Sequence, residues 1–141
     1  MYRNFVFDLY GTLINIHTNE EKSIVWKKLS LFYSYNGANY KPNELKYLGI
    51  HDYFDGLYSS SDIEICKPDK TFFNYLVKSE HLIKEESVFI GNDHICDVEG
   101  AKAASLDCLY IHSNQSRKIT EVTSKYAIWD GDISKILSIL S

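Results

Sequence analysis

The sequence has little proline, no basic stripe and no long apolar run, and each absence excludes a class of protein. Only two of its 141 residues are proline, and the composition is that of an ordinary globular chain. The net charge is −4 with no cluster of lysine and arginine, so we expect no nucleic-acid partner. No apolar run approaches the roughly 18 residues that cross a membrane, so we expect no membrane span.

Cysteine is also scarce, and the N-terminal segment lacks the apolar centre of a signal peptide. The three cysteines, Cys66, Cys96 and Cys108, are odd in number and have no metal-like spacing, which favours reduced thiols. Only three apolar residues stand between Arg3 and Asp8, too few for a signal peptide. These features predict a cytoplasmic protein.

Apolar segments alternate with helical patterns along the chain. Continuous apolar segments, expected to be strands, are residues 4–7, 87–90, 108–111 and 125–129, with 56–59 as a weaker one. Helical spacing is found at residues 20–35, 42–48, 68–82, 95–104 and 133–140. Strands that are apolar throughout are buried on both faces, as in parallel sheets covered by helices. The sequence therefore predicts one α/β domain, a doubly wound parallel sheet flanked by helices.

The first chemical signal is the pentapeptide Asp8–Thr12 (DLYGT), at the end of the first predicted strand. Ligands of open α/β sheets bind beyond the carboxyl ends of the strands. A carboxylate at this place can attack phosphorus or carbon. Gly11 permits a tight turn whose N–H groups face an anion, and Thr12 adds a hydroxyl donor. The structural alternative is an aspartate that only caps a turn.

The second signal is Lys67, which precedes Pro68 at the predicted start of a helix. The helix dipole slightly disfavours a cation at that end, which indicates another use, such as neutralising a bound anion. A surface lysine is the alternative.

The third signal is the pair Asp93 and Asp97, at the turn that follows the predicted strand 87–90. Asp97 falls in the first helical turn and can be explained as a helix cap, whereas Asp93 is harder to explain in that way. Asp8 and Asp93 would repel one another if nothing cationic lay between them. A bound Mg²⁺, which prefers oxygen ligands, resolves that repulsion, so the two acids predict a magnesium site.

The order of these signals, with the run 93–104 (DHICDVEGAKAA), resembles the haloacid dehalogenase-like superfamily over roughly residues 2–14 and 44–112. The resemblance implies a Rossmann-like core and a covalent intermediate on Asp8. For phosphatase members it implies attack of Asp8 on phosphorus and charge balance by Lys67. It also implies that Mg²⁺ is held by Asp8, the carbonyl of Tyr10 and a motif-four acid, Asp93, with Asp97 in the same motif.

Tyr10 and Asn92 depart from the phosphatase pattern. Tyr10 stands where phosphatase members carry a second aspartate as general acid–base, and a phenol with a pKa near 10 is poorly matched to that work. Members similar to 2-haloacid dehalogenases carry tyrosine there. Asp93 favours the phosphatases over the dehalogenases, because metal-free dehalogenases have uncharged residues in this part of the motif. Asn92 replaces an acid common in phosphatases, which predicts a reduced metal affinity.

The family's second motif, a strand ending in serine or threonine, has no counterpart in the sequence. It should precede the helix predicted at 42–48, yet the interval 15–43 holds one helical pattern and no apolar strand. Ser59, Ser60 and Ser61 come after that helix and are a poor substitute. Residues 15–49 are predicted to be a reduced helical cap within a single domain of residues 1–141. The missing strand predicts a gap, an exposed edge or a rearranged pairing in the sheet, and either a neighbouring strand or a second copy of the chain could take its place.

Three functions stay open on these grounds. The favoured one is Mg²⁺-dependent hydrolysis of a small phosphorylated metabolite, and the others are a 2-haloacid dehalogenase-like hydrolase and a non-catalytic remnant or association module, for example a homodimer. The predicted site residues are Asp8, Tyr10 and Lys67 for catalysis, Gly11 and Thr12 for substrate binding, and Asp8, Tyr10, Asp93 and Asp97 for the metal.

Overall fold

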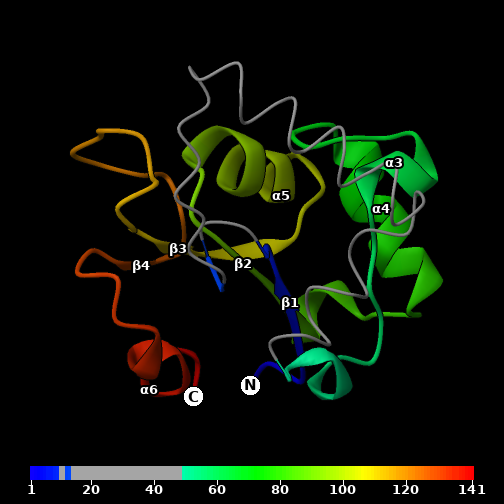
Figure 1. Cartoon of the computed structure of the whole chain (residues 1–141), viewed down its shortest axis with the longest axis horizontal. Coiled ribbons are helices and arrows are strands. Elements are labelled where there is room, and N and C mark those ends of the chain that lie inside the picture. The colour runs from blue at the N-terminus through cyan, green and yellow to red at the C-terminus, as the bar shows by residue number, and fades with distance from the viewer. Residues whose placement is uncertain (10–11, 14–48) are drawn as a thin grey trace. The chain divides into compact units, whose positions relative to one another are not determined.

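The structure is a computed structural model that describes residues 1–9, 12–13 and 49–141 (Figure 1). Its contacts divide the chain into two compact units, Met1–Ile16 with Ser60–Ser141, and His17–Ser59. The second unit is described only over residues 49–59, which contain the 3-10 turn η1 (His51–Tyr53). The helices predicted at 20–35 and 42–48 lie outside the described residues, as does all of the predicted cap except Gly49.

The first unit contains a four-stranded parallel sheet in the order β1-β2-β3-β4. The strands are β1 (Asn4–Phe7), β2 (Ser87–Gly91), β3 (Asp107–Ile111) and β4 (Tyr126–Ile128). Phe7 lies opposite Ile90, and Gly91 lies opposite Tyr110, so the carboxyl ends of neighbouring strands meet at one edge. The strands predicted at 4–7, 87–90, 108–111 and 125–129 are confirmed, and so is the parallel, Rossmann-like sheet.

Helices cover both faces of this sheet (Figure 1). On one face α4 (Lys70–Ser79) packs against β2, where the ring centroids of Phe73 and Phe89 are 5.0 Å apart. On the other face α6 (Ile136–Leu140) joins an apolar core cluster. That cluster consists of Val88, Ile90, Leu109, Ile111, Ile128, Ile136 and Leu140. Successive side chains of β2 therefore enter opposite cores, which explains why the whole strand is apolar.

Several helices begin or end away from their predicted bounds. The helix predicted at 68–82 is α4, which begins after Asp69 because the Asp69 carboxylate accepts the N–H of Thr71 at 2.9 Å and caps the helix. Pro68, predicted at the first helical position, precedes this cap, and the Lys67–Pro68 peptide bond is cis. The helix predicted at 95–104 begins as a π-helical turn, η3 (His94–Glu99), and continues as α5 (Gly100–Ala103).

The C-terminal helix predicted at 133–140 is confirmed, with a 3-10 first turn, η4 (Ile133–Lys135), before α6. The strand predicted at 56–59 is wrong, because these residues pair with no described strand. Gly56 and Ser59 are poor strand formers, and the two residues between them give too short an apolar run. A short helix, α3 (Ser60–Ile63), follows directly. Over the described ranges, no helix is both long and apolar enough to span a bilayer.

Gly100 sets the distance between two helices on the Phe89 face. A Cβ at this position would lie 2.4 Å from a ring carbon of Phe73 and 3.0 Å from the carbonyl oxygen of Pro68. Only glycine therefore allows α5 to approach α4 and the segment before it this closely. This close contact holds the backbone next to Lys67 against the sheet.

Candidate active site

The carboxyl ends of β1 and β2 place Asp8 at the predicted crevice. The backbone N–H of Asp8 donates to the carbonyl of Ile90 at 2.8 Å, which continues the ladder between the two strands. The Thr12 hydroxyl donates to Asp8 Oδ2 at 3.2 Å. The structure thus brings together Asp8 and Thr12 as predicted, whereas Tyr10 and Gly11 lie outside the described residues.

Lys67 lies between two carboxylates. Its Nζ is 2.5 Å from Asp8 Oδ1 and 2.6 Å from Asp97 Oδ1, and 5.4 Å from the centre of the Phe89 ring. The three polar side chains are 20, 17 and 1 % exposed for Lys67, Asp8 and Asp97. Burial alone would lower the pKa of Lys67, but the carboxylates of Asp97 and Asp8 outweigh it and raise this pKa. Lys67 is therefore not a surface lysine but a buried, protonated partner of Asp8.

Asp97 is the motif-four acid that converges with Asp8. Its second oxygen accepts the backbone N–H of Asp93 at 2.9 Å, while the first faces Lys67. Burial raises the pKa of Asp97, and the ammonium of Lys67 opposes this rise only in part. Gly91 makes room for the carboxylate, because a Cβ there would lie 2.3 Å from Asp97 Oδ2. Asp97 is therefore a buried charge rather than the helix cap that its sequence position allowed.

Asp93 has the capping role instead. Its Oδ1 accepts the backbone N–H groups of Ile95 and Cys96, both at 2.8 Å, and its Oδ2 accepts from Arg117 Nε at 3.2 Å. Burial alone would raise the pKa of Asp93, but the N–H groups of Cys96 and Ile95, with Arg117, hold it below its usual value. The carboxylate thus turns toward the turn of η3 and the loop after β3.

In this structure a lysine supplies the cation between two converging acids. The Lys67 ammonium already stands between Asp8 and Asp97, so their repulsion alone does not call for a metal. Within residues 1–9, 12–13 and 49–141, no three histidine, cysteine or acidic side chains are arranged to hold an ion. The donors beside Asp8 are nevertheless oxygens, and Mg²⁺ is often bound by one or two carboxylates with water and phosphate. The residues present therefore fit Mg²⁺ in donor type.

Asn92 and two serines complete the crevice, and none of the three was predicted as a site residue. Asn92 is buried: its Oδ1 accepts from the Thr12 hydroxyl at 3.3 Å, and its Nδ2 donates to Ser113 Oγ at 3.3 Å. The Ser116 hydroxyl donates to the Asn92 carbonyl at 2.8 Å. The sequence signal that could have found the serines is their position just after the strand Asp107–Ile111, at the same sheet edge as Asp8.

Comparison with known proteins agrees with this arrangement. The profile of the family described as haloacid dehalogenase-like hydrolase matches residues 27–111. The chain belongs to this family. It is 24 % identical over 104 residues to the Bacillus subtilis protein YfnB, which is named as a HAD-hydrolase, covering 72 % of this chain and 44 % of YfnB.

Two of this chain's relatives are named as phosphatases. It is 38 % identical over 55 residues to the glyceraldehyde 3-phosphate phosphatase of Methanocaldococcus jannaschii, which covers 39 % of this chain and 24 % of that protein. Its fold matches the crystal structure of a HAD phosphatase from Thermococcus onnurineus with a TM-score of 0.63 and 28 % identity, over 74 % of this chain and 47 % of that one. The chain thus spans less than half the length of these relatives.

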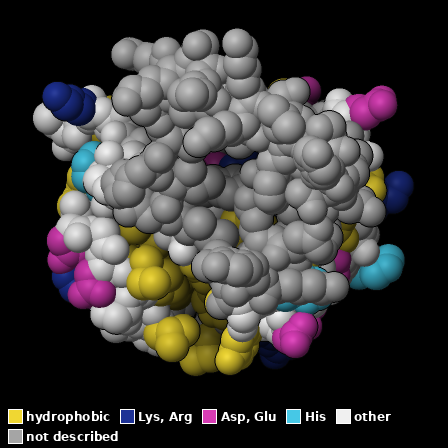
Figure 2. Space-filling view, in the orientation of Figure 1, with side chains coloured by type: hydrophobic (Ala, Val, Ile, Leu, Met, Phe, Trp, Pro, Cys, Tyr) yellow, Lys and Arg dark blue, Asp and Glu magenta, His cyan; other side chains and the backbone are white. Residues whose placement is uncertain are grey.

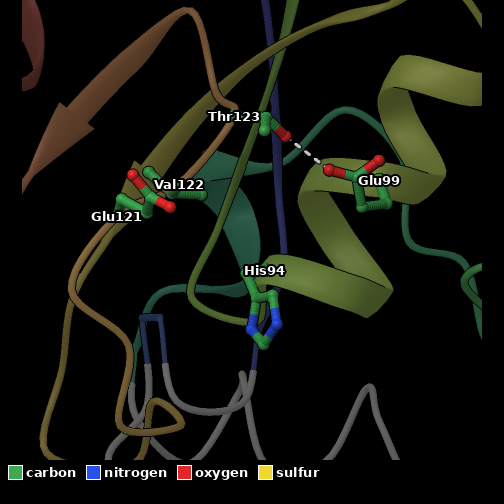
Figure 3. A pocket seen from close by; sticks show the side chains of 5 residues that line it. All are labelled: His94, Glu99, Glu121, Val122 and Thr123. Carbon is green, nitrogen blue, oxygen red and sulfur yellow. Dashed lines mark hydrogen bonds between the residues drawn. The ribbon is translucent and has the colours of Figure 1, made fainter.

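A second hollow of this haloacid dehalogenase-like chain lies beside η3. A cavity of about 350 Å³ is lined by His94, Glu99, Glu121, Val122 and Thr123 (Figure 3). The Thr123 hydroxyl donates to the Glu99 carboxylate, and the buried Nδ1 of His94 has no hydrogen-bond partner among the described residues. None of the lining residues belongs to the group around Asp8.

Proposed function

We propose that this chain hydrolyses a small phosphate ester with Asp8 as the nucleophile. The observation that carries the proposal is the buried Lys67 ammonium held between Asp8 and Asp97 at the carboxyl ends of the strands. A carboxylate paired with a neighbouring cation can attack phosphorus. The similarity to two proteins named as phosphatases supports this substrate class.

The reaction has two steps. An oxygen of Asp8 attacks phosphorus, and the bond to the ester oxygen breaks with its electron pair on the leaving alcohol, which takes up a proton. Water then attacks the aspartyl-phosphate, which releases inorganic phosphate and restores the Asp8 carboxylate. Lys67 balances the charge that gathers at the phosphoryl oxygens. Tyr10 is the proposed proton donor, and because a phenol with a pKa near 10 donates poorly to that purpose, we expect slow turnover.

Mg²⁺ is the proposed cofactor, with Asp8 and the Tyr10 carbonyl as ligands. Of the two motif-four acids, Asp93 is the better third ligand, because among the described residues its Oδ2 is bound only by the exposed Arg117. Both oxygens of Asp97 are engaged, by Lys67 and by a backbone N–H. When bound, the ion would neutralise phosphoryl charge. The solved structure of YfnB is described as bound to magnesium, which supports the choice of ion.

A dehalogenase-like reaction at carbon is the second candidate. The side chain that contacts Thr12 beside Asp8 is the neutral amide of Asn92, while Asp93 turns toward Arg117. The sequence disfavoured a dehalogenase because of the negative charge of Asp93. In the structure that carboxylate is turned toward Arg117 and lies farther from the crevice than its position in the motif suggested. A carboxylate substrate would meet less repulsion there.

An association role, such as a homodimer, is supported by exposed apolar side chains. Leu137 in α6 is 72 % exposed, and Ile133, four residues earlier in η4, is 51 % exposed. Hydrophobic side chains gather at the lower edge of the view in Figure 2.

The three cysteines are free thiols, which suits the reducing cytoplasm that we propose as the location of the protein.

The test is release of inorganic phosphate from a panel of small phosphate esters, with Mg²⁺ and with a chelator. We expect Mg²⁺-dependent release by the wild type, loss of release in Asp8→Asn, and wild-type release in Asp107→Asn, which alters an acid at the other end of the sheet. Release by Asp8→Asn equal to the wild type would refute the nucleophile. Chelator-insensitive halide release from a 2-haloacid would favour the dehalogenase reaction.

A further inference from the structure

The carboxyl ends of three adjacent strands each carry one polar side chain of the crevice. Asp8 directly follows β1, Asn92 directly follows β2, and Ser113 lies two residues beyond β3. The Asn92 amide joins the other two, since its Oδ1 meets the Thr12 hydroxyl beside Asp8 and its Nδ2 meets Ser113 Oγ, both at 3.3 Å. Ser113 therefore lies at the same edge of the sheet as Asp8, on the other side of the Asn92 amide.

The hydroxyl of Ser113 accepts two hydrogen bonds and, among the described residues, makes only one long donor contact. Its oxygen accepts from Asn92 Nδ2 and from the backbone N–H of Gln115, each at 3.3 Å. A serine oxygen has two acceptor positions, so what remains is the O–H donor. In the described part of the chain, the one acceptor within reach of that donor is Ser116 Oγ, at the long distance of 3.4 Å.

Ser116 differs from Ser113 in having its proton committed. Its hydroxyl donates to the Asn92 carbonyl at 2.8 Å, and its oxygen accepts the backbone N–H of Ser113 at 2.9 Å. These two bonds fasten the loop after β3 to the turn after β2. Ser116 therefore fixes the position of the loop, whereas the only donor contact of Ser113 among the described residues is the long one to Ser116, which a ligand oxygen could replace.

We infer that Ser113 is a substrate-binding residue, whose hydroxyl donates to an oxygen of the anionic group held at Asp8 and Lys67. This inference rests on the proposed phosphatase function. It would supply, from the loop after β3, the hydroxyl that the family takes from a strand-end serine or threonine and that the sequence does not offer in its usual place. A hydrogen bond from a neutral hydroxyl to an anionic oxygen is charge-assisted and among the stronger ones.

The experiment is calorimetric titration of the full chain with inorganic phosphate in the presence of Mg²⁺. The variants are Ser113→Ala, Ser113→Thr, which restores the hydroxyl, and Ser124→Ala as matched control. The Ser124 hydroxyl, in the same connecting segment, donates to the Cys108 carbonyl at 2.6 Å near the amino end of β3. Urea unfolding of each variant separates lost binding from lost folding.

We expect Ser113→Ala to weaken phosphate binding about tenfold, the worth of one charge-assisted hydrogen bond. Its urea midpoint should fall because buried Asn92 Nδ2 loses an acceptor, but the variant should still be folded in the titration buffer. Ser113→Thr should stay within about twofold of the wild type, and Ser124→Ala should bind as the wild type does. If Ser113→Ala binds phosphate as tightly as the wild type, or Ser113→Thr binds as weakly as Ser113→Ala, the inference is wrong while the phosphatase proposal stands. If the wild type itself binds no phosphate, both are wrong.

Discussion

Two lysines hold the two ends of the sheet, and their immediate geometry is nearly the same. At the carboxyl end, Lys67 Nζ lies 2.5 Å from Asp8 and 2.6 Å from Asp97. At the amino end, Lys125 Nζ lies 2.5 Å from Asp107 Oδ2 and 3.0 Å from the Tyr2 hydroxyl. Each ammonium also lies over an aromatic ring, at 5.4 Å for Lys67 and 5.6 Å over Tyr2 for Lys125.

Burial distinguishes the two ends. The Lys125 and Asp107 side chains are 53 and 36 % exposed, so water screens their attraction and the pair contributes little to stability. Lys67, Asp8 and Asp97 are mostly buried, so removing one partner leaves an uncompensated charge that water screens only weakly. The cluster at the amino end, Tyr2, Asp107 and Lys125, links β1, β3 and β4. The cluster at the carboxyl end, Asp8, Lys67 and Asp97, holds the charged groups that we propose meet a ligand. The comparison shows that distances alone do not identify a functional ion pair.

The largest expected effect comes from removing the buried cation. Lys67→Met leaves Asp8 and Asp97 without their shared partner, and we expect the free energy of unfolding to fall by about 3–5 kcal/mol. Urea unfolding at pH 7 measures it, with Lys67→Arg as the variant that keeps the charge. A loss below about 1 kcal/mol would show that the two lysines are energetically alike.

The next largest effect concerns the space that Asp97 occupies. Gly91→Ala puts a Cβ 2.3 Å from Asp97 Oδ2, and we expect a loss of about 1–3 kcal/mol. A double-mutant cycle with Asp97→Ala checks the cause, because the alanine at position 91 should cost less once the carboxylate is gone. Equal costs in the two backgrounds would mean that the clash is relieved by backbone movement.

Acid should act on the two ends through Asp93 and Asp107. The pKa of each lies below the ordinary value of 3.8 in the folded chain, Asp93 through the N–H groups that outweigh burial and Asp107 through Lys125 and Tyr2. Each acid therefore adds stability above pH 3.8 that is lost as the pH falls through its folded pKa. We expect Asp93→Asn and Asp107→Asn each to flatten the fall in stability between pH 5 and pH 2, by urea unfolding at a series of pH values; an unchanged slope in either variant contradicts its lowered pKa.

The smallest effect is expected at the exposed lysine. Lys125→Met should lower the free energy of unfolding by no more than about 1 kcal/mol, and the loss should shrink further in high salt. Phosphate binding in the presence of Mg²⁺ should be unchanged, since Lys125 lies at the end of the sheet away from Asp8. If Lys125→Met lowers the free energy of unfolding as much as Lys67→Met does, burial does not distinguish the two lysines in stability.

The sequence predicted the sheet better than the helix starts, for a local reason. A strand buried on both faces needs an apolar residue at every position, which β2 shows from Val88 to Ile90. The start of a helix depends on which side chain caps it, and several candidates precede each helix. Asp69 and Asp93 are the caps in the structure, which moved the start of α4 past Pro68 and began η3 at His94.

The acids of the site were predicted as a set, but it is the carboxylate of Asp97, and not that of Asp93, that shares Lys67 with Asp8. Which of Asp93 and Asp97 faces Asp8 depends on the π-helical turn, in which the N–H groups of Asp97 and Val98 both donate to the Asp93 carbonyl. The resulting turn sends the carboxylate of Asp97 beneath Gly91 toward Lys67. Sequence spacing could not show this, because a regular α-helical turn fits the same residues.

By itself the sequence determined the α/β class, the strands, the family, and the presence of Asp8, Thr12 and Lys67 at one edge of the sheet. These follow from local patterns: apolar runs, and short motifs placed at strand ends. Only the tertiary structure decided that Asp97 shares Lys67 with Asp8, that Asn92 lies beside Thr12, and that the Ser113 hydroxyl meets the Asn92 amide. The physical reason is that each of these depends on a contact between segments distant in sequence, which local pattern does not encode.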